Sequence, residues 1–425
     1  MNAVRFSTDW FEDAPNAAPE ECATACDLKI WIGDQNACLH VDGTDGDLYD
    51  HVTMPVYSLA EGLAHDWWSI FGARDKEYRF IKHRMGYATP DVRLRFDGAA
   101  FEASSHQHVY QNPDIRFWGS PTEVMTRQEA ENALAKFVED VVERLREKAV
   151  HGSSAELRWA RVYTSRADPN ETAFCEAAGA LGLDPYNIGE KEAAFIAQSA
   201  GIFSDEPLIE FLAGVAHSRA REDILTWITR VETLPGYQSR LPDLAPLAEQ
   251  VSRSARSRPG DRGWALGYRR ARATRAALDK KLNDRVQSVS ELARALGNKS
   301  FRRAAPVNGL RALISMRKEH IHVYLRERPS TLEAQVSEIF AFARALGDAI
   351  CFPKTPRSVV NELHEADRQA AGRAFAAEFL APIDEIRSMQ DDGKDAATIA
   401  DELNVSTEVV ERQLENKDRI RAVCN

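Results

Sequence analysis

Short runs in which apolar and polar residues alternate predict several strands in the first 125 residues. The run 91–96 has this period of two, and the turn residues Asp97 and Gly98 follow it, so we expect a hairpin there. Similar runs at 28–32 and 114–118 predict two further strands. These patterns indicate that the chain begins with a module that contains β-sheet.

Apolar residues that recur at intervals of three and four predict helices between and after these strands. The segment 58–73 shows this spacing, and Ser58 with Glu61 would form its capping box. The segment 126–148 has the same spacing with charged residues on its other face, and 155–240 is rich in helical segments. The order of elements predicts an α+β chain of several domains, with an N-terminal α/β module and a helical middle region.

Two later runs of small and aromatic residues carry a resemblance. The first reads Phe340-Ala-Phe-Ala-Arg-Ala-Leu-Gly-Asp348, and the second reads Arg373-Ala-Phe-Ala-Ala-Glu-Phe-Leu-Ala-Pro382. Together they resemble the active-site helix pair of the ImmA/IrrE family of bacterial zinc peptidases, over about residues 264–416. The resemblance implies a C-terminal metallopeptidase-like domain. The other interpretation of 340–352 is an ordinary core helix.

The metal ligands of that family are replaced in this chain. The family has His-Glu-x-x-His on its first helix, because two histidines one turn apart hold zinc and the glutamate activates the bound water. Those places hold Arg344, Ala345 and Asp348, and the place of the third ligand holds Ala371. A guanidinium has no lone pair for a metal and an alanine cannot take a proton. The resemblance therefore implies a kept scaffold with no catalytic residues, no metal and no cofactor.

Arg344 and Asp348 are spaced so that their side chains can meet on a helix. Residues four apart face each other, and these two have opposite charges. We therefore expect an ion pair between them in the place where the family binds its metal.

Three histidines offer an alternative, diverged zinc site. His320 and His322 flank Ile321 in the run 318–325, which looks like a strand, so alternation would place both on one face. His364 precedes Ala371 by two helical turns. Asp348, His364 and one strand histidine would then hold zinc. The preferred interpretation makes these four residues candidates for a binding cleft, with His364 in polar contact with Asp348.

The segment 398–414 has the apolar spacing of a helix-turn-helix unit. Asn404 would hold the turn and Ser406 would cap the second helix. That second helix carries Glu408, Glu411 and Glu415 with Arg412 as its one basic residue between them, whereas contact with phosphates needs positive charge. We therefore interpret this tail as a packing element, with DNA binding as the alternative.

Charge is distributed unevenly along the chain, whose net formal charge is −11. Residues 1–125 contain 20 acidic and 10 basic residues, whereas 251–303 contains 15 basic and 4 acidic ones. The basic candidates on a predicted helix are Arg269, Arg270, Arg272, Arg275, Lys280 and Lys281. They would bind nucleic acid, bind an acidic partner or the chain's own acidic N-terminal part, or form a solvated helix face.

Composition and the start of the chain favour a cytoplasmic protein. The chain has 425 residues, of which 44% are hydrophobic and 28% charged, as in ordinary globular proteins. The six cysteines are scattered, and the first residues have no apolar core typical of a signal peptide. We expect no membrane partner.

We expect four regions along the chain. They are an acidic α/β module (1–150), a helical middle region with a basic linker (155–250), a peptidase-like domain (260–385) and a helix-turn-helix-like tail (386–425). The resemblance implies a catalytically inactive regulatory or sensor protein that acts through protein–protein contacts in bacterial stress response, defence or mobile-element control. The alternatives are a zinc endopeptidase with diverged ligands that cleaves a repressor, and a DNA-binding transcriptional regulator.

Overall fold

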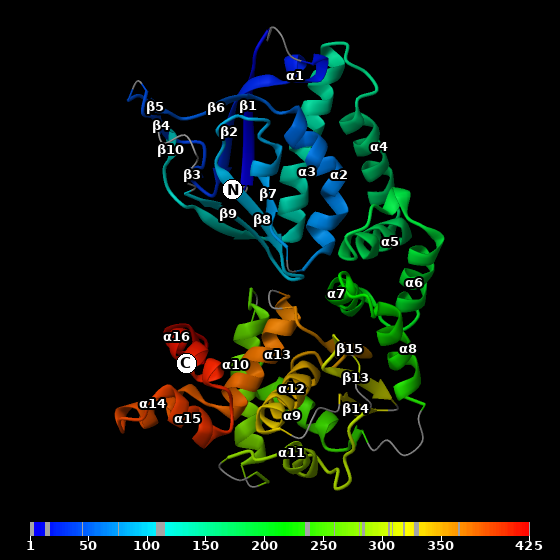
Figure 1. Ribbon diagram of the computed structural model, residues 1–425, viewed down its shortest axis with the longest axis vertical. Coiled ribbons are helices and arrows are strands. Elements are labelled where there is room, and N and C mark those ends of the chain that lie inside the picture. Colours follow the sequence, from blue (N-terminus) through cyan, green and yellow to red (C-terminus); the bar gives the residue numbers. More distant parts are fainter. Residues whose placement is uncertain are drawn as a thin grey trace. The chain divides into compact units, whose positions relative to one another are not determined.

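Helices and small antiparallel sheets alternate along the chain, which is an α+β fold as predicted (Figure 1). The structure is a computed structural model that describes all residues except 1–3, 13–17, 45, 75, 108–114, 234–238, 259, 280, 283–284, 305–306, 308, 318, 327–330, 364–365 and 425. The chain divides into two units, Met1–Ile196 and Ala197–Asn425. The segment 155–250, expected as one helical region, is thus shared between the two units.

The described residues of the first unit form three sheets whose strands pair antiparallel. Strand β2 (Ala25–Ile32) pairs with β1 (Val4–Trp10), β3 (Gln35–Asn36) and β6 (Val52–Pro55). The second sheet has the strand order β10 (Ile115–Phe117), β4 (His40–Asp42), β5 (Leu48–Tyr49). The third sheet has the strand order β11 (Thr122–Met125), β9 (Phe101–His106), β8 (Asp91–Phe96), β7 (Tyr78–Arg79).

Helices α2 (Tyr57–Gly72) and α3 (Arg127–Glu147) pack on these sheets and lie beside the strands in Figure 1, and α4 (Ser154–Arg166) and α5 (Pro169–Ala180) pack against α2. The other helical elements are α1 (Pro19–Ala23), η1 (Phe80–His83), η2 (Pro185–Asn187) and α6 (Glu190–Ala200). Trp67 and Trp68 of α2 are fully buried in the core, whereas Trp118 is exposed. Tryptophan in this unit therefore serves mostly, but not wholly, for core packing.

Local signals predicted most of these elements correctly. The hairpin forms as expected, because the Asp97 carboxylate accepts from the amides of Ala99 and Ala100 and Gly98 takes a φ of +99°. The helix expected at 126–148 is α3, and Thr126 with Glu129 forms its capping box. The predicted cap of α2 is wrong. That helix begins at Tyr57, whose amide donates to the Thr24 hydroxyl from a different part of the chain.

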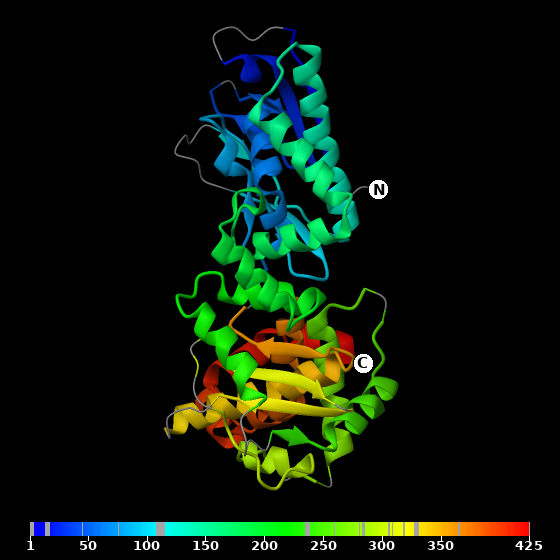
Figure 2. The ribbon, with the colours of Figure 1, turned by 90° about the vertical axis from the view of Figure 1, so that its right-hand side faces the viewer.

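The second unit contains one four-stranded antiparallel sheet in the order β12 (Arg240–Leu241), β14 (His320–Leu325), β13 (Ala312–Arg317), β15 (Arg357–Val360). Figure 2 shows these strands in front of the orange and red helices of the C-terminal part. The helices are α7 (Asp205–Val215), α8 (Arg221–Val231), α9 (Leu244–Ser254), α10 (Gly263–Leu278), α11 (Val289–Ala295), α12 (Leu332–Cys351), α13 (Asp367–Leu380), α14 (Ile383–Asp391), α15 (Ala396–Leu403), α16 (Thr407–Glu415) and α17 (Lys417–Cys424).

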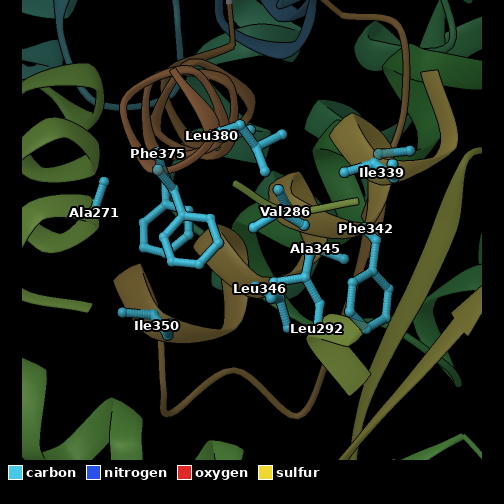
Figure 3. Packing of buried hydrophobic residues seen from close by; sticks show 14 of the residues in the cluster. Ala271, Val286, Leu292, Ile339, Phe342, Ala345, Leu346, Ile350, Phe375 and Leu380 are labelled. Atoms are coloured by element: carbon cyan, nitrogen blue, oxygen red, sulfur yellow. The ribbon is translucent and has the colours of Figure 1, made fainter. Parts of the chain in front are cut away.

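One face of this sheet packs against α12. Ile314, Ile321 and Val360 point to that face and join a core with residues of α12 and α13 such as Leu346 and Phe375 (Figure 3). Side chains alternate along a strand, so the neighbouring positions face the other way. The sheet thus separates the α12 side from a second, more polar side.

Glycines let α10, α12 and α13 approach one another closely. A Cβ on Gly347 of α12 would lie 2.6 Å from the Cβ of Phe375 on α13. A Cβ on Gly267 of α10 would overlap with the Ala371 carbonyl oxygen. Since a backbone atom cannot move aside as a flexible side chain can, the crossing of α10 and α13 requires glycine at this position.

The C-terminal tail forms the expected helix-turn-helix geometry. Asn404 ends α15 in the left-handed region at a φ of +56°, and Ser406 is the N-cap residue of α16, although its side chain makes no capping hydrogen bond. Figure 1 shows α14, α15 and α16 as a group, and Gln413 of α16 joins this group to the core. Its amide donates to Glu378 of α13 at 3.0 Å, and its carbonyl accepts from the Tyr268 hydroxyl at 3.1 Å.

Membrane crossing is not indicated by any described helix, since none is both long and apolar enough to span a bilayer.

The close crossing of α10 and α13 can be tested with Gly267→Ala. Alanine has a higher helix propensity than glycine. We nevertheless expect the variant's free energy of unfolding to fall by about 1–3 kcal/mol, because the new methyl group forces the two helices apart. Hydrogen exchange of peptides from α10 and α13 would measure the loss. Gly201→Ala is the matched control, since a Cβ there would lie 3.4 Å from the nearest carbonyl oxygen. Equal exchange in the two variants would contradict the close packing.

Candidate binding cleft and its polar network

Helices α12 and α13 bring four polar side chains into the interior of the second unit. Arg344 and Asp348 come from α12, and Arg368 and Gln369 come from α13. All four residues are buried, with exposures between 3% and 7%. Buried polar groups need partners, so the identity of those partners decides what the site can do.

Asp348 pairs with Arg368 and not with Arg344, so the predicted ion pair is wrong. The Arg368 Nε lies 2.6 Å from one Asp348 oxygen, and its Nη2 donates to the other oxygen at 2.8 Å. The Ser358 hydroxyl also donates to Asp348. Arg368 further donates to the Thr355 hydroxyl, and its guanidinium lies over the Phe352 ring. Helical spacing allowed the predicted pair, but a side chain from the next helix reaches both carboxylate oxygens.

The pair keeps Arg368 charged. Burial alone lowers the pKa of Arg368, but the neighbouring Asp348 carboxylate more than offsets this effect, so the pKa rises. Removing one partner would leave the other charge buried in a site without solvent. The pair therefore acts as one structural unit between α12 and α13.

Arg344 makes a different set of contacts. Its Nη2 donates to the carbonyl oxygen of Asn361 at 2.8 Å and to the side-chain oxygen of Gln369 at 3.0 Å. Both acceptors are neutral, and no carboxylate among the described residues lies within ion-pair distance of Arg344. Burial, with the nearby charges of Arg373 and Arg311, lowers its pKa to about 9, which still leaves it charged at neutral pH.

Glu210 of α7 joins this network through Gln369. The Gln369 amide donates to Glu210 Oε2 at 3.3 Å and to the Val359 carbonyl at 2.8 Å. Asn361 donates to the backbone of Glu210. Glu210 is 1% exposed, and burial raises its pKa to about 8, so this carboxyl is protonated near pH 7.

The sequence analysis did not identify Glu210, Gln369 or Ser358 as part of the site. A signal for Glu210 existed, because it is the one charged residue in the apolar run 207–213. A single charge in the buried stripe of a helix indicates a polar network. Gln369 and Ser358 had no comparable signal, since uncharged polar residues are common in loops and on surfaces.

Two cavities adjoin the network, and they differ greatly in size. The cavity beside Asp348 and Arg368 has a volume of about 10 Å³, which is roughly the space for one water molecule. A cleft of about 670 Å³ has Arg344 in its lining. This Arg344 cleft is lined by α12, α13, the end of α15 and the start of α16, together with Arg311 and Glu362. It has a size usual for ligand sites.

The remaining places of the family motif lie in the core. Ala345 and Ala371 are fully buried, and Figure 3 shows Ala345 within the hydrophobic cluster beside Leu346. A methyl group supplies neither a proton acceptor nor a metal ligand.

The strand histidines do not join Asp348. Ile314, Met316 and Ile321 line the small cavity with Asp348, so alternation puts Ser315 and His322 on the opposite face of the sheet, with His320. His322 is bonded there to the Ser239 hydroxyl, and burial lowers its pKa. The predicted group of His320, His322 and Asp348 is therefore wrong.

His364 lies outside the described residues. Within the described part of the chain, no group of three or more His, Cys, Asp and Glu side chains is arranged to hold a metal ion.

The basic candidates at 269–281 make contacts within the chain. Arg270 is 6% exposed and donates to the carbonyl oxygens of Ile350 and Cys351. Arg269, Arg272, Arg275 and Lys281 pair with Asp261, Glu378, Glu385 and Asp243, in that order. Lys280 lies outside the described residues. Each described member is therefore held by the core or by an acidic neighbour of the second unit, and binding of nucleic acid or of an acidic partner stays a prediction.

Comparison with protein-family models, with curated proteins and with solved structures finds no match to this chain.

The buried pair can be tested by removing one partner or both. Asp348→Leu leaves the Arg368 charge unpaired in the interior, so we expect the free energy of unfolding to fall by about 3–5 kcal/mol. The double variant Asp348→Leu with Arg368→Met removes both charges, and its free energy of unfolding should fall clearly less. Hydrogen exchange of α12 peptides would measure the two losses. Glu408→Leu breaks the exposed pair with Arg412 and should cost less than about 1 kcal/mol. Equal losses for the single and double variants would contradict the pairing.

Glu210 predicts a pH dependence of stability. Its folded pKa of about 8 lies above the ordinary value of 4.5, so the folded state holds a proton that the unfolded state releases. The contribution of Glu210 to the free energy of unfolding is fully present below pH 4.5 and is lost as the pH rises through about 8. Between these values the free energy of unfolding falls by up to about 1.4 kcal/mol per pH unit.

We expect Glu210→Gln to remove this part of the slope, as measured by urea unfolding between pH 5 and pH 8.5. The exposed Glu249→Gln should keep the wild-type slope. A Glu210→Gln slope equal to that of the wild type would show that Glu210 is ionised in the folded protein.

Proposed function

We propose that this chain is a regulatory or sensor protein that has a metallopeptidase-like scaffold and no hydrolytic activity. One observation carries the proposal. The interior between α12 and α13, where the resemblance would place zinc, is filled by the Arg368–Asp348 pair and the Arg344–Gln369–Glu210 chain of contacts. The adjoining cavity has a volume of about 10 Å³, so no substrate fits beside Asp348.

The chemistry of these side chains supports binding rather than hydrolysis. Two guanidiniums cannot ligate a metal. One Asp348 oxygen accepts hydrogen bonds from Arg368 and Ser358, and the other lies 2.6 Å from the Arg368 Nε. Glu210 is a buried carboxyl that could act as a base, but its contacts lead to Gln369 and not to the Arg344 cleft. The Arg344 cleft is the larger of the two cavities described beside the network, and it is the proposed site for a signal.

The proposed action is through protein–protein contacts, as the resemblance implies for a bacterial system of stress response, defence or mobile-element control. The first 125 residues have an excess of 10 acidic residues over basic ones, which suits a basic partner. This part of the proposal rests on analogy.

Metal content tests the loss of hydrolysis. We expect protein purified without an affinity metal to hold no stoichiometric zinc, as measured by mass spectrometry of the metal. The matched variant combines Arg344→His, Ala345→Glu, Asp348→His and Ala371→Glu with Arg368→Ala, because the Arg368 guanidinium would otherwise lie where the metal belongs. That variant should gain zinc if the scaffold is that of a zinc peptidase.

Two results would contradict the proposal. One zinc ion per wild-type chain together with cleavage of a protein substrate would show a working peptidase with diverged ligands. A reconstructed variant that folds and still takes up no zinc would remove the peptidase-like scaffold on which the proposal depends.

A further inference from the structure

Arg344 places a buried positive charge at the wall of the Arg344 cleft. Among the described lining residues, Arg344 is the one charged residue that is buried, at 6% exposure. Its two hydrogen bonds use Nη2 alone and go to neutral acceptors. A buried cation without an anion is costly, and it is stabilised when an anion binds next to it.

Other charges of the lining already have partners or face solvent. Arg311 pairs with Glu362, and Arg412 pairs with Glu408 at 2.9 Å. Glu333 and Asp401 are exposed, so water screens them, but they still oppose a ligand with several negative charges. Arg373 is a further, half-buried arginine of the lining and has a contact within the chain. The lining thus contains four basic and four acidic side chains, whose charges balance, so it favours an anion with a single charge.

The start of α16 adds a second attraction for an anion. Ser406, Thr407 and Glu408, which form the N-cap and first turn of this nine-residue helix, line the cleft. The Ser406 side chain makes no capping hydrogen bond. The amides of a first helical turn carry partial positive charge and point away from the helix body.

The rest of the lining is largely apolar. Val336 and Phe340 of α12, with Val405 and Val409 of the tail, contribute hydrocarbon surface to the cleft. Phe340 lies one helical turn before Arg344, so apolar surface adjoins the charge directly. A ligand that fits has an apolar body and one anionic end.

We propose that the Arg344 cleft binds a small carboxylic acid with an apolar body, whose carboxylate contacts Nη1 of Arg344. The inference rests on the proposed function in one respect: it takes the cleft as the site of a signal and not of a substrate. A carboxylate supplies the single charge, and an aliphatic or aromatic body covers Phe340 and the valines.

Titration of the full-length protein with octanoate, followed by calorimetry, tests the proposal. We expect saturable binding of one octanoate per chain. Octanamide has the same body without the charge and should bind roughly tenfold weaker or more, because the charge-assisted hydrogen bond is absent. Octyl phosphate has up to two charges and should bind no more tightly than octanoate.

Two variants place the binding site. Arg344→Gln should abolish the difference between octanoate and octanamide. Phe340→Glu puts a carboxylate four residues before Arg344, where it supplies the missing anion from within the chain, so octanoate binding should be lost in a folded protein. Arg253→Gln is the matched control. Arg253 is exposed on α9 and is not among the residues that line the cleft, so its loss should change the affinity less than about threefold.

Several outcomes would overturn the inference. These are equal binding of octanamide and octanoate, tighter binding of octyl phosphate, or octanoate binding that is unchanged in Phe340→Glu. The last result also decides the case if Arg344→Gln does not fold. If the wild-type protein holds no zinc and does not bind octanoate, this inference fails and the proposed function stands. If the wild-type protein holds zinc and its octanoate binding depends on Arg344, the proposed function fails and this inference stands.

Discussion

The ion pair between Asp348 and Arg368 is the contact on which the centre of the second unit depends. It joins α12 to α13 in an interior that solvent does not reach, and Ser358 extends it to the edge strand of the sheet. Because both charges are buried, each needs the other. The pair therefore fixes how the two helices face each other, and the contacts of Arg344, Gln369 and Glu210 follow from that arrangement. A polar network of this kind is specific, because few other arrangements satisfy all of its members.

Close helix packing and the polar network depend on one another. Gly347 and Gly372 allow α12 and α13 to approach within backbone contact, and this short distance lets Arg368 reach both oxygens of Asp348. Gly267 does the same for α10 and α13. Small residues in these helices thus have a packing role that does not depend on any resemblance to a peptidase.

The sequence predicted elements well where the signal was local, and it predicted contacts poorly where they joined distant segments. Periodicity and turn residues were enough for the hairpin at Asp97, for α3 and for the turn at Asn404. Helical spacing suggested that Arg344 meets Asp348, but the actual partner comes from a different helix 20 residues later. His320 and His322 share one face of the sheet as predicted, but this face points away from Asp348. The alternation of a strand shows which residues share a face, and it does not show which face a helix covers. The basic run at 269–281 had the same weakness, since its acidic partners come from other segments.

The position of Gln413 has a consequence for the tail. Through Glu378 and Tyr268 this one amide holds α16 against α13 and α10, and the first turn of the same helix is a wall of the Arg344 cleft. A ligand that needs this wall binds only while the tail is docked. The free energy by which docking strengthens ligand binding therefore equals the free energy by which the bound ligand stabilises docking. Occupancy of the cleft and release of the tail are thus thermodynamically opposed. An occupied cleft would hide the inner face of α16, and an empty one would make that face easier to expose.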